Sequence, residues 1–307
     1  MIRVEGVGHR FGSLRVLHDV WFHVPEGEVF GFIGPNGAGK TTTLRMMATL
    51  LEPDEGRVLL DGVDVVDDPA AVRRLLGFMP DSFGVYERVT VIEYLDFFAA
   101  AYDIERSARP RTVQAVMELT DLGPLRDRLV AAMSKGMKQR LAIARTLLHD
   151  PKVLILDEPA NGLDPRARIE MRDLILQLRD LGKTVLLSSH ILTELSDMVS
   201  SVAILEKGRV LAAGKVDEIR KNLRPERTLR MTLLRPPVDL NAPFAEMPSV
   251  HEVSLSPDGA LRLSFEGGDE VVAELVARCV PYGVVRVEPE RDDLERIFLE
   301  VTKGELQ

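Results

Sequence analysis

Apolar residues cluster or recur along this chain with the periods of strands and helices, and together they predict a mixed α/β fold. Residues 28–33 form a compact apolar strand that enters a glycine-rich loop, and residues 42–51 repeat apolar side chains at helical spacing. Continuous apolar runs at 153–156 and 184–188 are typical of strands buried in a parallel sheet. The segment between them, 165–181, begins with proline and ends before a glycine, so the three segments predict a βαβ unit.

The rest of the pattern predicts further elements and a boundary between two domains. Residues 2–24 indicate strands, whereas the periodicity from 91 to 148 is helical. The composition shifts near 224–226, and the pattern beyond it predicts strands around 229–233, 253–255 and 261–265, a turn at 257–259, and helical stripes at 271–279 and 294–301. We therefore expect a first domain at 1–221, with a helical subdomain at about 83–148, and a C-terminal accessory α+β domain at 222–307.

Composition and charge restrict the classes of function. The formal net charge is −9, and this acidic balance disfavours a nucleic-acid partner, because binding a phosphate backbone needs a basic face. The single cysteine, Cys279, excludes an intrachain disulfide and favours a reduced, intracellular setting. No apolar run reaches the roughly 18–20 residues needed to cross a bilayer, and no signal peptide is apparent. Any membrane role is therefore expected to come through a partner chain.

Residues 34–41 match the phosphate-loop pattern G-x-x-x-x-G-K-[ST] at every fixed position. The glycines let successive N–H groups point inward as an anion nest, and the following helix adds its positive N-terminal end. Lys40 is expected to reach the β- and γ-phosphates of ATP, and the Thr41 hydroxyl to ligate Mg²⁺. A plain glycine-rich turn is the alternative, but the strand before it and the helix after it favour nucleotide binding. The expected nucleotide-binding residues here are Gly34, Pro35, Asn36, Gly37, Ala38, Gly39, Lys40, Thr41 and Thr42.

Two adjacent acids follow the buried strand at 153–156. Asp157 is placed to hold the Mg²⁺ shell opposite Thr41, and Glu158 to polarise the attacking water as a general base. An acid pair that caps the next turn is the alternative, because a proline follows immediately. A phosphate loop in the same chain favours catalysis. We therefore predict an ATPase with Lys40 and Glu158 as catalytic residues.

With motifs in the family's order, residues 2–220 resemble the ATPase subunit of ABC transporters. Residues 133–140 resemble its signature motif, whose consensus begins Leu-Ser-Gly-Gly-Gln: Ser134 and Gly136 agree with it, and the departures are Met133, Lys135 and Met137. A serine before a helix is by itself usually an N-cap. The resemblance implies instead that this helix end closes over the γ-phosphate bound by the opposite subunit. A single copy of the motif then implies a homodimer or a heterodimer of ATPase chains.

Four further positions correspond to motifs of the family's nucleotide site, and one of them departs from the usual residue. Asp164 resembles the D-loop aspartate that communicates across the dimer, and it also fits the N-cap of the following helix. His190 resembles the switch histidine that contacts the γ-phosphate, with a structural role as the alternative. Phe11 fits the aromatic residue that stacks on adenine, with core packing as the alternative. Asp81 stands where the family usually has the Q-loop glutamine. It keeps an oxygen ligand for Mg²⁺ but loses the amide donor, so we expect hydrolysis with altered metal or pH dependence.

The resemblance also implies a fold and a function. The fold is α/β, a P-loop NTPase (RecA-like) core with an antiparallel β-subdomain and a helical subdomain, followed by a small C-terminal α+β domain. The Ser-Lys-Gly signature and the appended domain resemble ABC-2-type exporters. That likeness implies a separate transmembrane permease and a peripheral, cytoplasmic location on the inner face of the membrane. The candidate docking surface is the segment 83–102, with Val85, Tyr86, Phe97 and Phe98. Core packing of the helical subdomain is the alternative, and it claims some of these residues.

Other functions remain as alternatives. Importer subunits share the core motifs, so the direction of transport rests on the weaker part of the resemblance. Soluble ABC ATPases that act on ribosomes or DNA usually carry two cassettes or long coiled coils, and this sequence has one cassette and no heptad arm. Asp81 alone hints at a nucleotide-gated module with low turnover. The C-terminal domain carries no recognisable catalytic constellation, and its alternative roles are dimerisation, regulation and stabilisation.

Overall fold

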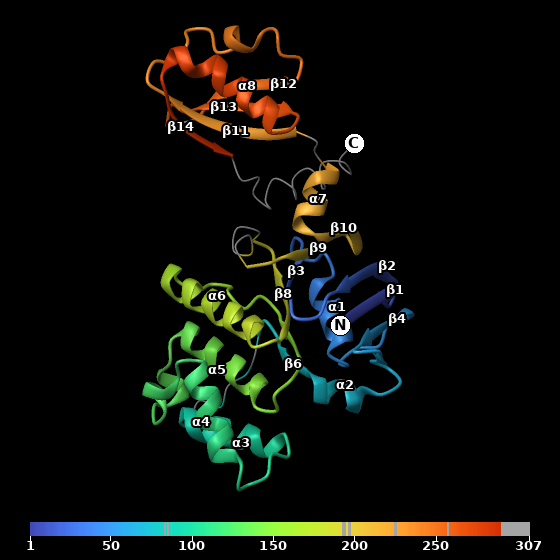
Figure 1. Ribbon diagram of the computed structural model, residues 1–307. Helices are drawn as coiled ribbons and strands as arrows, with labels where there is room; N and C mark the ends of the chain where they lie inside the picture. Colours follow the sequence, from blue (N-terminus) through green and yellow to red (C-terminus); the bar gives the residue numbers. More distant parts are fainter. Residues whose placement is uncertain are drawn as a thin grey trace. The chain divides into compact units, whose positions relative to one another are not determined.

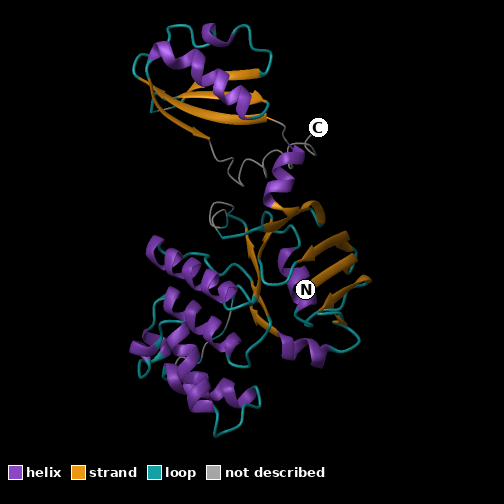
Figure 2. Ribbon diagram, viewed as in Figure 1, coloured by secondary structure: helices purple, strands orange, loops and turns teal. Residues whose placement is uncertain are grey.

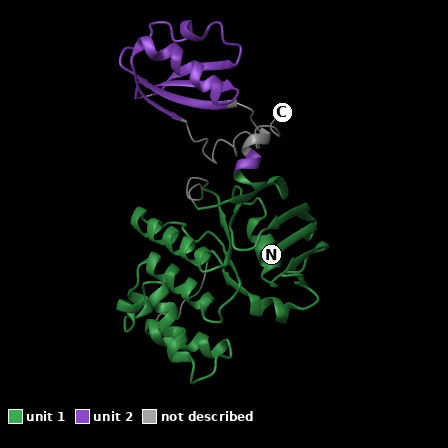
Figure 3. Cartoon of the chain, viewed as in Figure 1, with its two compact units in different colours: residues 1–216 green, residues 217–307 purple. Residues whose placement is uncertain are grey.

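The chain divides into two compact units, Met1–Val216 and Asp217–Gln307 (Figure 3). The computed structural model describes residues 1–82, 84, 86, 88–191, 195, 198–223, 226–256 and 258–289. Some positions named from the sequence lie outside these residues: Phe83, Val85, Pro257 and the helical stripe expected at 294–301. The assignment of residues 222–307 to an accessory domain stays a prediction.

The first unit is built on a sheet with the strand order β10-β9-β3-β8-β7-β6 (Figure 1). Its strands from β9 to β6 run parallel, and β10 pairs antiparallel with β9. β3, β7 and β8 are buried along their whole length, which explains why their sequences are apolar runs rather than alternating ones. The strands span Val29–Ile33 (β3), Leu76–Met79 (β6), Val153–Leu156 (β7), Thr184–Ser189 (β8), Ser201–Glu206 (β9) and Arg209–Lys215 (β10).

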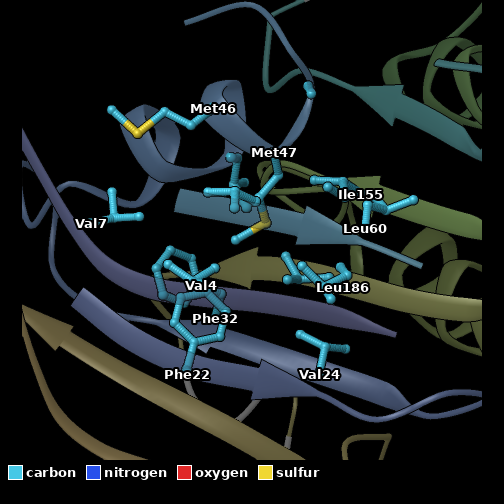
Figure 4. Packing of buried hydrophobic residues seen from close by; sticks show 14 of the residues in the cluster. Val4, Val7, Phe22, Val24, Phe32, Met46, Met47, Leu60, Ile155 and Leu186 are labelled. Atoms are coloured by element: carbon cyan, nitrogen blue, oxygen red, sulfur yellow. The ribbon is translucent and has the colours of Figure 1, made fainter. Parts of the chain in front are cut away.

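A second, antiparallel sheet of the first unit has the order β2-β1-β4-β5. Helix α1, Lys40–Met47, shares one hydrophobic cluster with both sheets. Figure 4 shows Phe22 of β2 beside Phe32 of β3, and these rings stack with centroids 5.1 Å apart. The cluster includes Ala38 of the loop and Leu44, Met46 and Met47 of α1, so it holds both the helix and the loop before it against the sheets. The strands span Ile2–Phe11 (β1), Leu14–Val24 (β2), Glu55–Leu60 (β4) and Val63–Asp64 (β5).

Helices and the loops that join them form the remainder of the first unit (Figure 2). Helix α3 begins with a capping box in which the Thr90 side chain accepts the Glu93 N–H and Glu93 accepts the Thr90 N–H. Among the described residues, no helix is both long enough and apolar enough to cross a bilayer. The helices of this unit span Pro69–Leu75 (α2), Val91–Ala101 (α3), Arg109–Leu119 (α4), Lys135–Leu147 (α5) and Pro165–Asp180 (α6), with short 3₁₀ turns at Gly123–Leu125 (η1) and Val130–Ala132 (η2). Helix α7, Val216–Leu223, starts at the last residue of the first unit and otherwise belongs to the second.

The second unit contains an antiparallel sheet with the order β12-β13-β11-β14 and the helix α8. Leu229, Leu263 and Leu275 belong to its hydrophobic core. Cys279 lies in the same core, and burial raises the pKa of its thiol to about 11. The elements span Glu226–Leu233 (β11), Ala242–Phe244 (η4), Val250–Leu255 (β12), Leu261–Glu266 (β13), Asp269–Cys279 (α8), Val280–Tyr282 (η5) and Val284–Pro289 (β14).

Candidate nucleotide site

The glycine-rich loop curls between the end of β3 and the start of α1. Gly37 and Gly39 have φ values of 81° and 107°, which side chains disfavour. A Cβ on Gly34 would lie 2.2 Å from the Leu205 carbonyl oxygen, so the loop can pass β9 only as glycine. Lys40 Nζ is buried and donates to the carbonyl oxygens of Gly34 at 2.7 Å and Pro35 at 3.3 Å. The lysine amino group is therefore held inside its own loop.

An open pocket of about 470 Å³ lies over this loop. The ends of several parallel strands meet at one edge of such a sheet, where α/β proteins bind ligands. The pocket unites Lys40, Thr41, Asp81, Glu158 and His190, which the sequence analysis had named separately. Its full lining is Val16, Pro35, Asn36, Gly37, Gly39, Lys40, Thr41, Thr42, Asp81, Glu158, Asn161 and His190. Gly34 and Ala38 do not line it and instead shape the loop beneath.

Asp157, directly after β7, is fully buried beneath the pocket. The Thr41 hydroxyl donates to its Oδ2 at 3.0 Å, and the Ser188 hydroxyl donates to its Oδ1 at 2.6 Å. Burial raises the pKa of Asp157 above its usual value; the two hydrogen bonds lower it in part, and the charges of Glu158 and Asp81 add to the rise. The acid is therefore held in a fixed orientation in a place that disfavours its own charge.

Glu158 presents its carboxylate to both Lys40 and His190. Its backbone has a φ of 51°, a left-handed conformation that is uncommon outside glycine. Oε1 lies 3.4 Å from Lys40 Nζ, and Oε2 lies 2.9 Å from His190 Nδ1. The carboxylate thus lies between a cation of the phosphate loop and the imidazole that follows β8. An acid so placed can polarise a water molecule that attacks a bound phosphate.

Asp81, which follows β6, lines the same pocket as Glu158. Its Oδ1 accepts a hydrogen bond from Asn161 Nδ2 at 3.4 Å. The oxygens of Thr41, Asp157 and Asp81 are the hard ligands that Mg²⁺ prefers. No cluster of three acidic, histidine or cysteine side chains in the described residues is arranged to hold a metal by itself. The two carboxylates and the hydroxyl fit Mg²⁺, which is usually bound by one or two carboxylates together with water and phosphate oxygens.

The signature residues lie apart from the phosphate loop. Ser134, Gly136 and Asp164 line another pocket, of about 370 Å³. Ser134 caps α5 by accepting the Met137 N–H at 3.3 Å, and Asp164 caps α6 by accepting the Ala167 N–H at 2.9 Å. Both capping roles weighed from the sequence are therefore present. The phosphate loop of this chain does not meet its own signature residues in either pocket.

Phe11 is 51% exposed at the end of β1 and does not line the pocket over the phosphate loop. The alternative that it is a core residue is therefore wrong. The rings of Phe11 and His9 pack edge to face, with their centroids 4.7 Å apart. Sequence reasoning gave no role at the nucleotide to two lining residues, Val16 and Asn161. The Asn161-Gly162 turn, so soon after Glu158, was a usable signal, whereas Val16 is one apolar residue in an alternating strand.

This chain is similar in sequence and in fold to ATP-binding proteins of ABC transporters. The family model described as ABC transporter matches residues 17–161. The ABC transporter ATP-binding protein NatA of Bacillus subtilis is 37% identical over 231 residues, which cover 74% of this chain and 94% of the relative. A daunorubicin resistance ATP-binding protein of Streptomyces coeruleorubidus is 34% identical, covering 98% of this chain and 95% of the relative. A solved structure titled as the ATP binding subunit of an ABC transporter matches with a TM-score of 0.65 and 34% identity, over 72% of this chain and 92% of that one.

Replacing Asp157 with asparagine is expected to stabilise the nucleotide-free protein at neutral pH. Because the pKa of Asp157 is raised in the folded state, its protonated form favours folding, and that contribution is lost as pH rises through the folded pKa. Asp157→Asn should therefore unfold at higher urea concentration than wild type at neutral pH. The advantage should vanish as pH falls toward the usual aspartate pKa of about 4. Asp173→Asn, on the exposed face of α6, is the matched control, and an Asp157→Asn protein less stable than wild type at neutral pH would contradict the argument.

Proposed function

The chain belongs to the ABC transporter family of ATP-binding proteins, and from this we propose that it is the ATPase subunit of an exporter whose membrane-spanning part is a separate chain. The family binds and hydrolyses ATP. The observation that carries the proposal for this chain is the carboxylate of Glu158, held between Lys40 and His190 over the phosphate loop. The relative named for daunorubicin resistance supports export rather than import. The substrate class, whether drug, lipid, glycan or peptide, belongs to the partner chain.

In the proposed mechanism the phosphate loop binds the triphosphate of ATP. Its backbone N–H groups and the N-terminal end of α1 attract the anion. Lys40 Nζ, which donates to two loop carbonyls, exchanges them for phosphate oxygens. Thr41 and Asp157 would hold Mg²⁺, which supplies positive charge to the β- and γ-phosphates when bound. The side chain of Phe11 is exposed and available to stack on adenine.

Glu158 is the proposed general base. It accepts a proton from the water that attacks the γ-phosphorus, while the bond from that phosphorus to the bridging oxygen breaks and ADP leaves with the oxygen. Lys40 offsets the negative charge on the phosphate beside it. His190 orients the carboxylate through the contact between Nδ1 and Oε2. It also lines the pocket, and contact with the γ-phosphate is its proposed second role. Hydrolysis therefore needs a side chain from each of three segments, the loop after β3 and the ends of β7 and β8.

Glu158→Gln is expected to lower kcat for ATP hydrolysis at least a hundredfold while ATP still binds, because the amide keeps the size of the side chain but accepts no proton. Phosphate release and equilibrium binding of a fluorescent ATP analogue measure the two effects. Glu274→Gln, on α8 of the second unit, is the control. Equal, near-zero turnover of wild type and Glu158→Gln would instead favour the nucleotide-gated module.

The separation of the two pockets supports a dimer as the functional form. Ser134 and Gly136 lie at the N-terminal end of α5, a second place where an anion is favoured. We propose that they contact the γ-phosphate bound by a second ATPase chain, homologous or identical, and that Asp164 lies at the same interface. ATP together with Glu158→Gln should trap this dimer, and a protein that stays monomeric by light scattering under those conditions would contradict it.

Asp81 is the proposed third oxygen ligand toward Mg²⁺, in place of the family's glutamine. Its charge adds to that of two neighbouring acids, so it should strengthen the attraction of the site for a cation. Asp81→Gln is expected to raise the Mg²⁺ concentration for half-maximal ATPase activity severalfold and to change the pH profile.

Asp81→Asn is the matched variant for this test, because it removes the same charge while it keeps the shorter side chain. Both variants should shift the Mg²⁺ titration in the same direction. Mg²⁺ and pH profiles of Asp81→Gln that coincide with those of wild type would refute the role of the carboxylate.

The exposed aromatic residues near α3 are the proposed docking surface for the membrane-spanning chain. Tyr86 is 57% exposed and Phe97 53% exposed, and their ring centroids lie 5.5 Å apart. Tyr94 is buried, and Phe98 lies under the Arg145 guanidinium at 5.1 Å. The predicted segment therefore divides into core residues and an exposed pair. Docking there would place the chain at the inner face of the membrane.

Phe97→Ser is expected to reduce the fraction of the chain that sediments with membranes from cells that produce it, because the pair would lose apolar contact area. ATPase activity of the purified protein should change less than about twofold. Leu181→Ser, which alters an exposed leucine just after α6, is the control. An unchanged membrane fraction for Phe97→Ser would contradict this surface, and a wild-type chain found only in the soluble fraction would favour a soluble ABC ATPase.

A further inference from the structure

A buried hydroxyl near the end of β8 connects the two acids of the proposed catalytic site. Ser188 is fully buried. Its Oγ donates to Asp157 Oδ1 at 2.6 Å and accepts the backbone N–H of Glu158 at 2.9 Å. We propose that Ser188 is a positioning residue that holds Asp157 and Glu158 together in the geometry that ATP hydrolysis requires. The inference rests on the functions proposed above for those two acids.

The first effect of Ser188 is on the backbone of Glu158. The residue before it, Asp157, donates its N–H to the Met79 carbonyl oxygen of β6 at 2.8 Å. Glu158 then turns into the left-handed region, with φ of 51°, and donates its own N–H to Ser188 on the other neighbouring strand. A non-glycine residue holds such a conformation only where its surroundings impose it. The hydrogen bond to Ser188 is therefore a direct restraint on the turn that aims Glu158 at Lys40 and His190.

The second effect is on the carboxylate of Asp157. Its two oxygens are held by different hydroxyls, Oδ2 by Thr41 and Oδ1 by Ser188. Thr41 lines the pocket and is a proposed metal ligand, so its bond to Asp157 is open to exchange when a cation binds. Ser188 does not line the pocket. The hydrogen bond from Ser188 can therefore keep the plane of the Asp157 carboxylate in place both before and after a cation binds.

The surroundings of Ser188 argue against a purely incidental hydroxyl. The three residues before it on β8, Val185, Leu186 and Leu187, are buried and apolar, and a hydroxyl among them is costly unless it is hydrogen-bonded. Thr184, at the other end of the same strand, is also buried, and its Oγ1 accepts the Gly27 N–H at 2.9 Å. The two hydroxyls are alike in burial and in satisfaction of a backbone N–H. Only Ser188 contacts the acids.

This pair of hydroxyls makes a matched experiment. Ser188→Ala is expected to lower kcat about ten- to a hundredfold, the effect typical of losing a hydrogen bond to a charged group. KM for ATP should stay within about twofold, and the Mg²⁺ concentration for half-maximal activity should rise severalfold. Thr184→Val removes the other hydroxyl and should leave kcat and the Mg²⁺ requirement within about twofold of wild type. This should hold even if its Tm falls as far as the Tm of Ser188→Ala. Ser188→Thr retains the hydroxyl and should recover most of kcat.

Two results would overturn the proposal. One is Ser188→Ala with the kcat and the Mg²⁺ dependence of wild type, and the other is equal losses of kcat in Ser188→Ala and Thr184→Val at equal losses of Tm. If Ser188→Ala does not fold, Ser188→Cys, of similar size and with a weaker donor, is held to the same criteria. Glu158→Gln separates the two levels of inference. If Glu158→Gln keeps wild-type turnover, the proposed function falls and this inference with it, whereas an inactive Glu158→Gln beside a normal Ser188→Ala refutes the role of Ser188 alone.

Discussion

The carboxylate of Asp157 joins the helix after β3, the end of β7 and the end of β8 at one buried point. Thr41 and Ser188 each donate a hydrogen bond to it, and without such partners a charge at this depth would not persist. The order β3-β8-β7-β6 puts the carboxyl-terminal ends of these strands at one edge. The site depends on that arrangement, because its side chains come from the segments directly after these strands: Lys40 after β3, Asp81 after β6, Glu158 after β7 and His190 after β8.

Several features of the site lower the stability of the folded chain. Burial and neighbouring acids raise the pKa of Asp157, and Glu158 adopts a backbone conformation that side chains disfavour. Lys40 offsets the charge of Glu158 at 3.4 Å, yet its amino group also serves loop carbonyls. These features cost stability in the nucleotide-free chain, and functional sites commonly carry such costs because their groups are arranged for a ligand rather than for folding. The nucleotide and the cation proposed to bind here would relieve these costs and so stabilise the folded protein.

Particular residues show how far reasoning from the sequence could reach. The phosphate loop and the run at 153–156 are read from contiguous residues, and β3, α1 and β7 agree with them. The predicted helix at 42–51 starts earlier in the structure, at Lys40, since the loop itself supplies the first turn. Strand β14 was not predicted, because its pairing with β11 joins residues more than fifty positions apart. Ser134 and Asp164 were each given two readings. Their roles as N-caps of α5 and α6 are visible in a single chain. The proposed contact with nucleotide would need a second ATPase chain.

The sequence by itself determined the chemistry that lies along the backbone: a glycine-rich anion nest with Lys40 and Thr41, and two acids at the end of an apolar strand. These depend on neighbouring residues, so local patterns report them. Only the tertiary structure decided that Ser188 joins the two acids, that Val16 and Asn161 enter the pocket, and that Phe11 is exposed. The reason is that strand order and register, set by burial of the whole core, bring together side chains that sequence spacing leaves unrelated.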